Sequence, residues 1–149
     1  MALSARAPEW DTWRVMSQEN VDLVRRLNAA FNAREYSVLE RHIDPEAEFT
    51  DHMPLPDVAR SAHGRDEMLA ILDAWSQGFQ GFEAHIVEYV DPGEFVVTVT
   101  RWKFVSRDKG IEMEWPGAEA YQIRDGKIVW SESGFRDKDA ALDAVAQRK

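Results

Sequence analysis

Apolar residues recur at helical spacing in the first half of the chain. The clearest stripe follows Ser17, a good N-cap, and consists of Val21, Val24, Leu27 and Phe31. Two later stretches show the same period, and the apolar face of the longer one includes Trp75. The pattern therefore predicts three helices that begin near residues 17, 36 and 65.

From residue 82 onward, the pattern changes to the alternation and the β-branched and aromatic residues that are typical of strands. Turn signals such as Asp125-Gly126 indicate short connections between antiparallel neighbours. The expected strands span residues 82–90, 95–105, 111–123 and 127–135, after an earlier short strand over 46–51. A last helix is expected to open at Asp137. Helices grouped on one side of such a meander make an α+β fold.

Composition and charge narrow the class of protein. The chain has 149 residues, 44% of them hydrophobic, which suits a single domain over 17–149 after an N-terminal extension over 1–16. The absence of cysteine excludes disulfides and thiolate metal sites. The net charge of −9 argues against nucleic acids and anionic membranes as partners. No apolar run suits a membrane span or a signal peptide, so we expect a cytoplasmic protein.

The stretch "EFTDHMPLP", which starts at Glu48, ends the short strand with a carboxylate next to an imidazole. Alternation puts Phe49 and Asp51 on one face and His52 on the other, unless a bulge turns His52 inward. A carboxylate in an apolar pocket gains basicity by desolvation, which suits proton abstraction next to a carbonyl. The alternative is that Asp51 caps the following loop and that His52 is a half-exposed loop residue.

Four segments carry a resemblance to a known family: "SQENVDLVRRLNAAFNAREYSVLERHIDPEAEFTD", "GRDEMLAILDAW", "YQIRDGKIVWSESGF" and "RDKDAALDA", which together cover about residues 17–145. The chain resembles the SnoaL-like group of the nuclear transport factor 2-like superfamily, which includes ketosteroid isomerases, polyketide cyclases and limonene epoxide hydrolases. The resemblance implies a cone-shaped, curved and mostly antiparallel sheet wrapped around three N-terminal helices, with a C-terminal helix. It also implies a deep pocket inside the cone and often a homodimer.

The resemblance suggests roles for single residues. Asp51 falls where ketosteroid isomerases and SnoaL-type cyclases carry their catalytic Asp. Similarity to limonene epoxide hydrolases places Arg101 and Lys103 toward the pocket mouth, but Lys103 stands where those enzymes need an acid. The alternative is that both basic residues lie on the surface. Glu132, or Ser133 by another count, would replace their second acid. The missing carboxylate argues against an epoxide-hydrolase triad.

Strand parity adds further residues to the expected lining of the pocket. With Arg101 and Lys103 facing inward, Val99 faces inward too, and Trp102 and Phe104 form an apolar patch on the outer face. A homodimer through the sheet would cover that patch.

On the next two strands, parity gives two more shared faces. One holds Met113, Trp115, Glu119 and Tyr121, and the other holds Ile128, Trp130 and Glu132. An inward Glu119 needs a partner, for which Arg101 is the natural choice. Tyr121 would donate a hydrogen bond to a developing oxyanion.

We therefore expect a pocket protein for a small apolar or aromatic molecule, without metal or cofactor. If it is an enzyme, it is a cofactor-independent isomerase or cyclase, or a lyase or hydrolase. Asp51 would be the general base, and His52, Tyr121 or Arg101 would polarise the substrate oxygen. The expected ligand contacts are Phe49, Trp75, Val99, Lys103, Trp115, Glu119, Trp130 and Glu132. The alternative is a non-catalytic ligand-binding or dimeric interaction module of the same fold.

Overall fold

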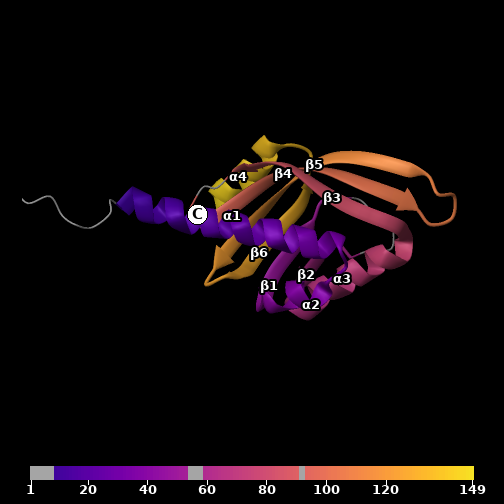
Figure 1. Ribbon diagram of the computed structural model, residues 1–149, viewed down its shortest axis with the longest axis horizontal. Helices are drawn as coiled ribbons and strands as arrows, with labels where there is room; N and C mark the ends of the chain where they lie inside the picture. The colour runs from indigo at the N-terminus through magenta and orange to yellow at the C-terminus, as the bar shows by residue number, and fades with distance from the viewer. Residues whose placement is uncertain (1–8, 54–58, 91–92) are drawn as a thin grey trace, which may run out of the picture.

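The computed structural model describes residues 9–53, 59–90 and 93–149, with side chains described from residue 18 onward. Its elements follow one another along the chain as shown in Figure 1. They are α1 (Glu9–Asn32), α2 (Tyr36–Arg41), β1 (Ile43–Asp51), β2 (Ser61–His63), α3 (Arg65–Gly78), β3 (Phe79–Val90), β4 (Phe95–Ser106), β5 (Glu112–Arg124), β6 (Lys127–Phe135) and α4 (Lys138–Arg148).

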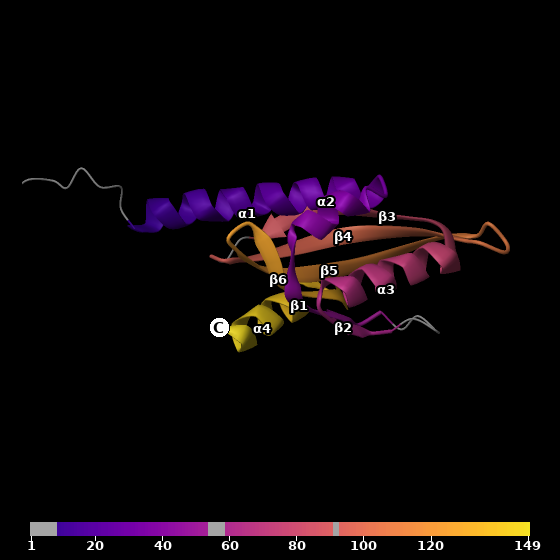
Figure 2. The ribbon, with the colours of Figure 1, turned by 90° about the horizontal axis from the view of Figure 1, so that it is seen from below.

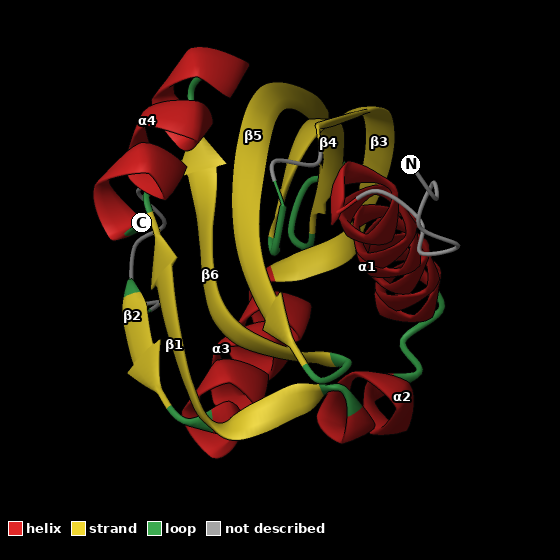
Figure 3. Cartoon of the chain, turned by 90° about the vertical axis from the view of Figure 1, so that its left-hand side faces the viewer, coloured by secondary structure: helices red, strands yellow, loops and turns green. Residues whose placement is uncertain are grey.

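The strands of the described chain form one sheet in the order β2-β1-β6-β5-β4-β3. The run from β3 to β6 is the antiparallel meander that the short turns predict. β1 then joins the far edge of β6 in parallel, and β2 pairs with β1. Pattern analysis did not predict β2, because three residues are too few to show a period. Figure 3 shows the sheet curving around α1 and α3.

Helices cover both faces of the sheet. The helices α1, α2 and α3 pack in the hollow of the inner face, and α4 packs on the outer face. Figure 2 shows α1 and α4 on opposite sides of the sheet. Two apolar clusters result: the inner one includes Leu27, Trp75 and Trp102, and the outer one includes Trp130 and Val145. The predicted α+β fold with a curved, mostly antiparallel sheet is confirmed.

The first helix is longer than the sequence pattern predicts. It begins at Glu9 rather than after Ser17, which lies inside it. The segment "EWDTWRVM" has no clear apolar stripe, but it contains no glycine or proline to end a helix. The side chains of Trp10 and Trp13 lie outside the described residues. Among the described helices, none combines the length and apolar character needed to cross a bilayer.

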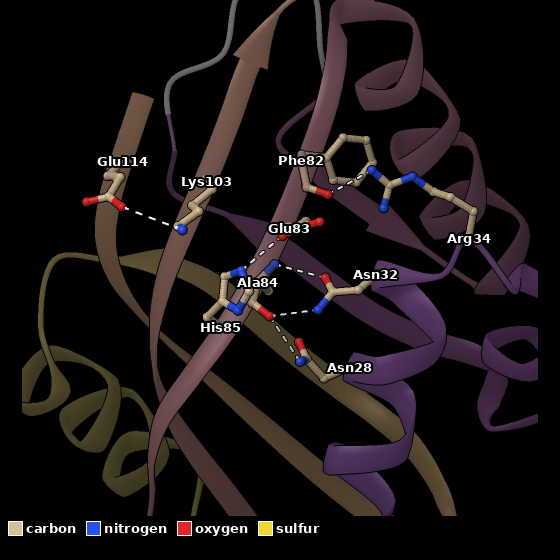
Figure 4. A network of polar contacts seen from close by, with 9 residues as sticks. All are labelled: Asn28, Asn32, Arg34, Phe82, Glu83, Ala84, His85, Lys103 and Glu114. Carbon is tan, nitrogen blue, oxygen red and sulfur yellow. Dashed lines mark hydrogen bonds and ion pairs between the residues drawn. The ribbon is translucent and has the colours of Figure 1, made fainter. Parts of the chain in front are cut away.

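Polar side chains tie the C-terminal part of α1 to the edge strand β3 (Figure 4). Asn32 donates to the carbonyl of Ala84 at 2.9 Å and accepts from its N–H at 2.9 Å, as a neighbouring strand would. Asn28 donates to the same carbonyl at 3.1 Å. Arg34 donates to the carbonyl of Phe82 at 2.7 Å and stacks over its ring at 3.7 Å. These contacts hold α1 over the hollow of the sheet.

Candidate functional site

A cavity of about 140 Å³ lies between the inner face of the sheet and the helices α1, α2 and α3. Its walls are mainly apolar, with aromatic rings from Phe31, Phe49, Trp75 and Trp102. The polar residues that line it are Asn28, Asp51, Glu119, Tyr121, Ser131 and Ser133. Such an apolar hollow with a few converging polar groups is the usual form of a small-molecule site.

A larger depression of about 330 Å³ lies outside this cavity, where the end of α1 meets β3 and the β4–β5 hairpin. Charged residues such as Arg34, Glu83, Lys103 and Glu114 line it. Neither Asp51 nor Glu119 reaches it. The smaller cavity, which gathers both buried carboxylates, is therefore the candidate site.

Asp51 ends β1 with its side chain in the cavity and only 3% of its surface exposed. One carboxylate oxygen, Oδ1, accepts from the N–H of Met53 at 2.9 Å. Burial raises the pKa of Asp51 above 3.8, although hydrogen bonds from Met53 and Ser133 and the charges of His52 and Arg60 oppose the rise. Asp51 is thus more basic than a surface aspartate.

Glu119 lies on β5 and is 2% exposed. Its Oε1 accepts from the hydroxyls of Thr98, at 2.9 Å, and Thr100, and its Oε2 accepts from the indole N–H of Trp102 at 3.3 Å. Burial raises the pKa of Glu119 from 4.5 to about 7, and the negative charge of Asp51 adds to the rise against those three donors. Glu119 therefore changes its charge near neutral pH.

Tyr121 also lines the cavity. Burial raises the pKa of its phenol above the ordinary value, and the charge of Glu119 raises it further. A hydrogen bond with the Thr98 side chain opposes the rise. The phenol thus keeps its proton near neutral pH.

The predicted orientation of β4 is wrong. Thr98 lies opposite Glu119, and Trp102 lies opposite Trp115, so the even-numbered residues of β4 face inward. Trp102 and Phe104 belong to the inner cluster and do not form an exposed patch. Arg101 and Lys103 are exposed on the other side and lie outside the cavity, where water solvates their charges.

Two more predictions fail with that orientation. Val99 does not line the cavity, because it shares the outward parity of Arg101. Glu119 does not pair with Arg101; hydroxyl and indole donors satisfy it instead. A buried carboxylate needs partners, but neutral donors can supply them.

The predicted parity of β5 is right, but Trp115 is not a cavity wall. It shares the inner face with Glu119 and Tyr121, opposite Trp102, yet it is 45% exposed. Figures 1 and 2 show the reason: the β4–β5 hairpin extends past the end of α3, so no described helix covers that part of its inner face.

The last strand departs from simple alternation. The register shifts by one residue between Gln122 and Ile123, so Ile128 faces the inner cluster while Trp130 faces the outer one. Trp130 is therefore wrongly predicted as pocket wall and packs under α4. Glu132 also lies outside the cavity.

His52 lies outside the cavity as well. It is exposed, its Nε2 lies 2.9 Å from Oε2 of Glu132, and its ring packs against Phe135 with 4.9 Å between centroids. Regular alternation continues through Asp51, so no bulge turns the imidazole inward. Of the predicted site residues, the structure gathers Phe49, Asp51, Trp75, Glu119 and Tyr121 around the cavity.

The partners of Glu119 were missed by sequence reasoning. The signal that could have found them is the turn of the β4–β5 hairpin, which pairs Ser106 with Ile111 through a backbone hydrogen bond of 2.9 Å. Counting back from that pair places Thr98 opposite Glu119. Within the described part of the chain, no group of three or more acidic or histidine side chains could hold a metal ion.

A known protein family matches most of the chain. The family model of the SnoaL-like domain matches residues 24–131, which include both buried carboxylates. The chain belongs to the SnoaL-like family. A search of curated protein sequences found no significant match.

Solved structures of SnoaL-like and related proteins share the fold at low sequence identity. Bal32a, from a soil-derived mobile gene cassette, has a TM-score of 0.72 and 20% identity over 87% of this chain and 97% of its own. A putative SnoaL-like polyketide cyclase from Jannaschia sp. CCS1 has a TM-score of 0.70 and 17% identity over 97% and 96%. IdmH, a putative polyketide cyclase from Streptomyces antibioticus, has a TM-score of 0.67 and 18% identity over 86% and 98%.

Proposed function

We propose that this SnoaL-like protein binds a small apolar or aromatic molecule and acts on it as a cofactor-independent isomerase or cyclase. The observation that carries the proposal is the buried carboxylate of Asp51 in an apolar cavity. Asp51 would abstract a proton from carbon next to a carbonyl, since desolvation makes it a stronger base. The putative cyclase activity named for two structural neighbours is compatible with such chemistry.

Tyr121 would supply the hydrogen-bond donor that this mechanism needs beside the base. A base that removes a proton next to a carbonyl needs a donor for the oxygen on which negative charge develops. Of the three donors considered from the sequence, His52 and Arg101 lie outside the cavity, whereas Tyr121 lines it in its protonated form. We assign the polarising role to its phenol.

Hydrogen–deuterium exchange tests the proposed base without knowledge of the natural substrate. One-ring ketones are incubated with the protein in D₂O, and exchange at the carbon next to the carbonyl is followed by NMR. Replacement of Asp51 by Asn should lower the exchange rate by roughly 10²–10⁴-fold. The control E114Q removes an exposed carboxylate of the hairpin and should exchange like the natural protein. Equal rates for D51N and the natural protein would remove Asp51 as the base.

One observation favours the non-catalytic alternative. The Oδ1 atom of Asp51 is already engaged by the N–H of Met53, as in a residue that caps a loop. In that case the protein is a ligand-binding module of the same fold, and D51N would lower stability rather than turnover. In either case we propose a cytoplasmic homodimer in which a second copy covers the apolar side chains exposed on the hairpin, Ile111, Met113 and Trp115.

A further inference from the structure

Ser131 carries a buried hydroxyl that no role described so far uses. It lies on β6, is 4% exposed and lines the cavity. Its neighbours Trp130 and Glu132 lie outside the cavity, so strand alternation points the Ser131 side chain into it.

The Ser131 hydroxyl has no hydrogen-bond partner in the described part of the chain. The unpaired side-chain atoms that are closed off among the described residues are Nε of Arg65 and Nε1 of Trp75. The oxygen of Ser131 is not one of them, so it keeps open contact with the cavity. Buried hydroxyls in native proteins normally have a partner, and a ligand in the cavity would supply the one that Ser131 lacks.

The sheet places Ser131 close to the proposed base. β6 lies between β1 and β5, and Ser131 is opposite Phe49 in the parallel pair with β1. Asp51 comes two residues after Phe49 on the same face of β1, so Ser131 and Asp51 are diagonal neighbours, whose usual spacing is roughly 7–8 Å. That spacing leaves room for a carbon next to a carbonyl at Asp51 and for the carbonyl oxygen at Ser131.

The hydroxyl of Ser131 is also less committed than the phenol of Tyr121. Tyr121 lies opposite Ser131 on β5, one strand further from Asp51. Its phenol shares a hydrogen bond with Thr98, which competes with a ligand for the phenol proton. In the described part of the chain, Ser131 has no such competitor.

From this placement we infer that Ser131 is a further catalytic residue, whose hydroxyl donates a hydrogen bond to the carbonyl oxygen of a ketone with its acidic C–H at Asp51. The proton passes from carbon to the Asp51 carboxylate, the C–H electron pair forms the new C=C bond, and the carbonyl π pair moves to oxygen. Ser131 keeps its own proton and stabilises the enolate oxygen. The inference rests on the proposed isomerase or cyclase function.

The size of the cavity limits the ketone to one ring. Its volume of about 140 Å³ is close to that of an apolar cavity known to accept benzene, about 150 Å³. A single ring with a short carbonyl substituent, such as acetophenone, is therefore a suitable probe.

Two probes of the same shape separate a hydrogen bond from a packing effect. Acetophenone carries the carbonyl oxygen, and α-methylstyrene carries a CH₂ group in its place. In calorimetric titrations, S131A should weaken the binding of acetophenone about fivefold and leave that of α-methylstyrene unchanged. The control S61A removes an exposed hydroxyl from β2 and should change neither affinity. Equal effects of S131A on both probes would assign Ser131 a structural role and overturn the inference.

Deuterium exchange into acetophenone tests the catalytic role. S131A should exchange roughly 10²–10³-fold more slowly than the natural protein, and S61A should match the natural protein. If S131A fails to fold, the nearly isosteric S131C serves, because a thiol is a weak donor and should also slow the exchange. Exchange by the natural protein that is unchanged in these Ser131 variants would overturn this inference alone. A natural protein that exchanges no faster than buffer would overturn the proposed function, and this inference with it.

Discussion

At the scale of single residues, the two buried carboxylates differ in how the chain satisfies them. Asp51 takes a backbone N–H from the loop that follows it, whereas Glu119 takes two hydroxyls and an indole N–H from the neighbouring strand. Both line the same apolar cavity, and the charge of Asp51 adds to the cost of ionising Glu119. Glu119 is therefore the carboxyl group of the two whose pKa lies near neutral pH.

The pKa of Glu119 makes stability depend on pH. Between its unfolded value of 4.5 and about 7, the folded protein holds a proton that the unfolded chain has released. The free energy of unfolding should therefore fall as pH rises through this window, by on the order of 3 kcal/mol at about 1.36 kcal/mol per pH unit. Urea unfolding at a series of pH values measures this fall. E119Q should flatten it, and an equally steep fall in E119Q would assign the effect to other groups.

Gly134 sets the position of Asp51. Its φ of +78° is a left-handed conformation, and a Cβ there would lie 2.6 Å from the nitrogen of Met53 and 2.8 Å from Oδ1 of Asp51. G134A should therefore lower the free energy of unfolding by more than about 3 kcal/mol and abolish any activity that needs Asp51. The control is G126A, with a φ of +73° and nothing within 4 Å of the new Cβ, which should cost only about 1 kcal/mol. Equal losses would contradict the steric argument.

At the scale of elements, period and turn signals predicted where helices and strands lie, but not which face of β4 points inward. Alternation alone leaves two choices for that strand, and similarity to limonene epoxide hydrolases favoured the wrong one. The hairpin turn decides between them, because it sets Trp102 opposite Trp115. The register shift between Ile128 and Trp130 could not be predicted from the sequence, because no residue in "KIVW" marks a bulge.

The join between α1 and β3 offers a test at this scale. Asn32 forms two hydrogen bonds with the backbone of Ala84, and Asn28 forms one. At about 1 kcal/mol for each bond, with a further penalty for the backbone N–H left unpaired, N32A should destabilise the protein by roughly 2–3 kcal/mol and N28A by about 1 kcal/mol. Denaturant unfolding of the two variants measures the difference. Equal effects would mean that Asn32 does not act as a partner for the edge strand.

At the scale of the whole molecule, the sheet encloses an apolar cavity on its inner face, and α4 covers part of its outer face. The β4–β5 hairpin projects beyond this body and exposes Ile111, Met113 and Trp115, at 52%, 43% and 45%. A monomer that leaves such a stripe in water is prone to associate through it. This stripe is the candidate dimer surface. Trp102 and Phe104, which the sequence suggested for that surface, are buried.

The proposed dimer should depend on that stripe. Light scattering after gel filtration should give twice the monomer mass for the natural protein and the monomer mass for W115E, because a charge in an apolar interface is costly. K109Q changes the net charge by the same amount in the hairpin turn and should leave the dimer intact. A monomeric natural protein, or a W115E that remains dimeric, would rule out this surface.

A carbon-13 NMR titration of the side-chain carboxyl groups, assigned with D51N and E119Q, tests the buried site directly. Glu119 should titrate with a midpoint near 7 and Asp51 above 3.8, because both lie in one apolar cavity. Midpoints at the ordinary values of 4.5 and 3.8 would show that water reaches both groups and would contradict the buried site.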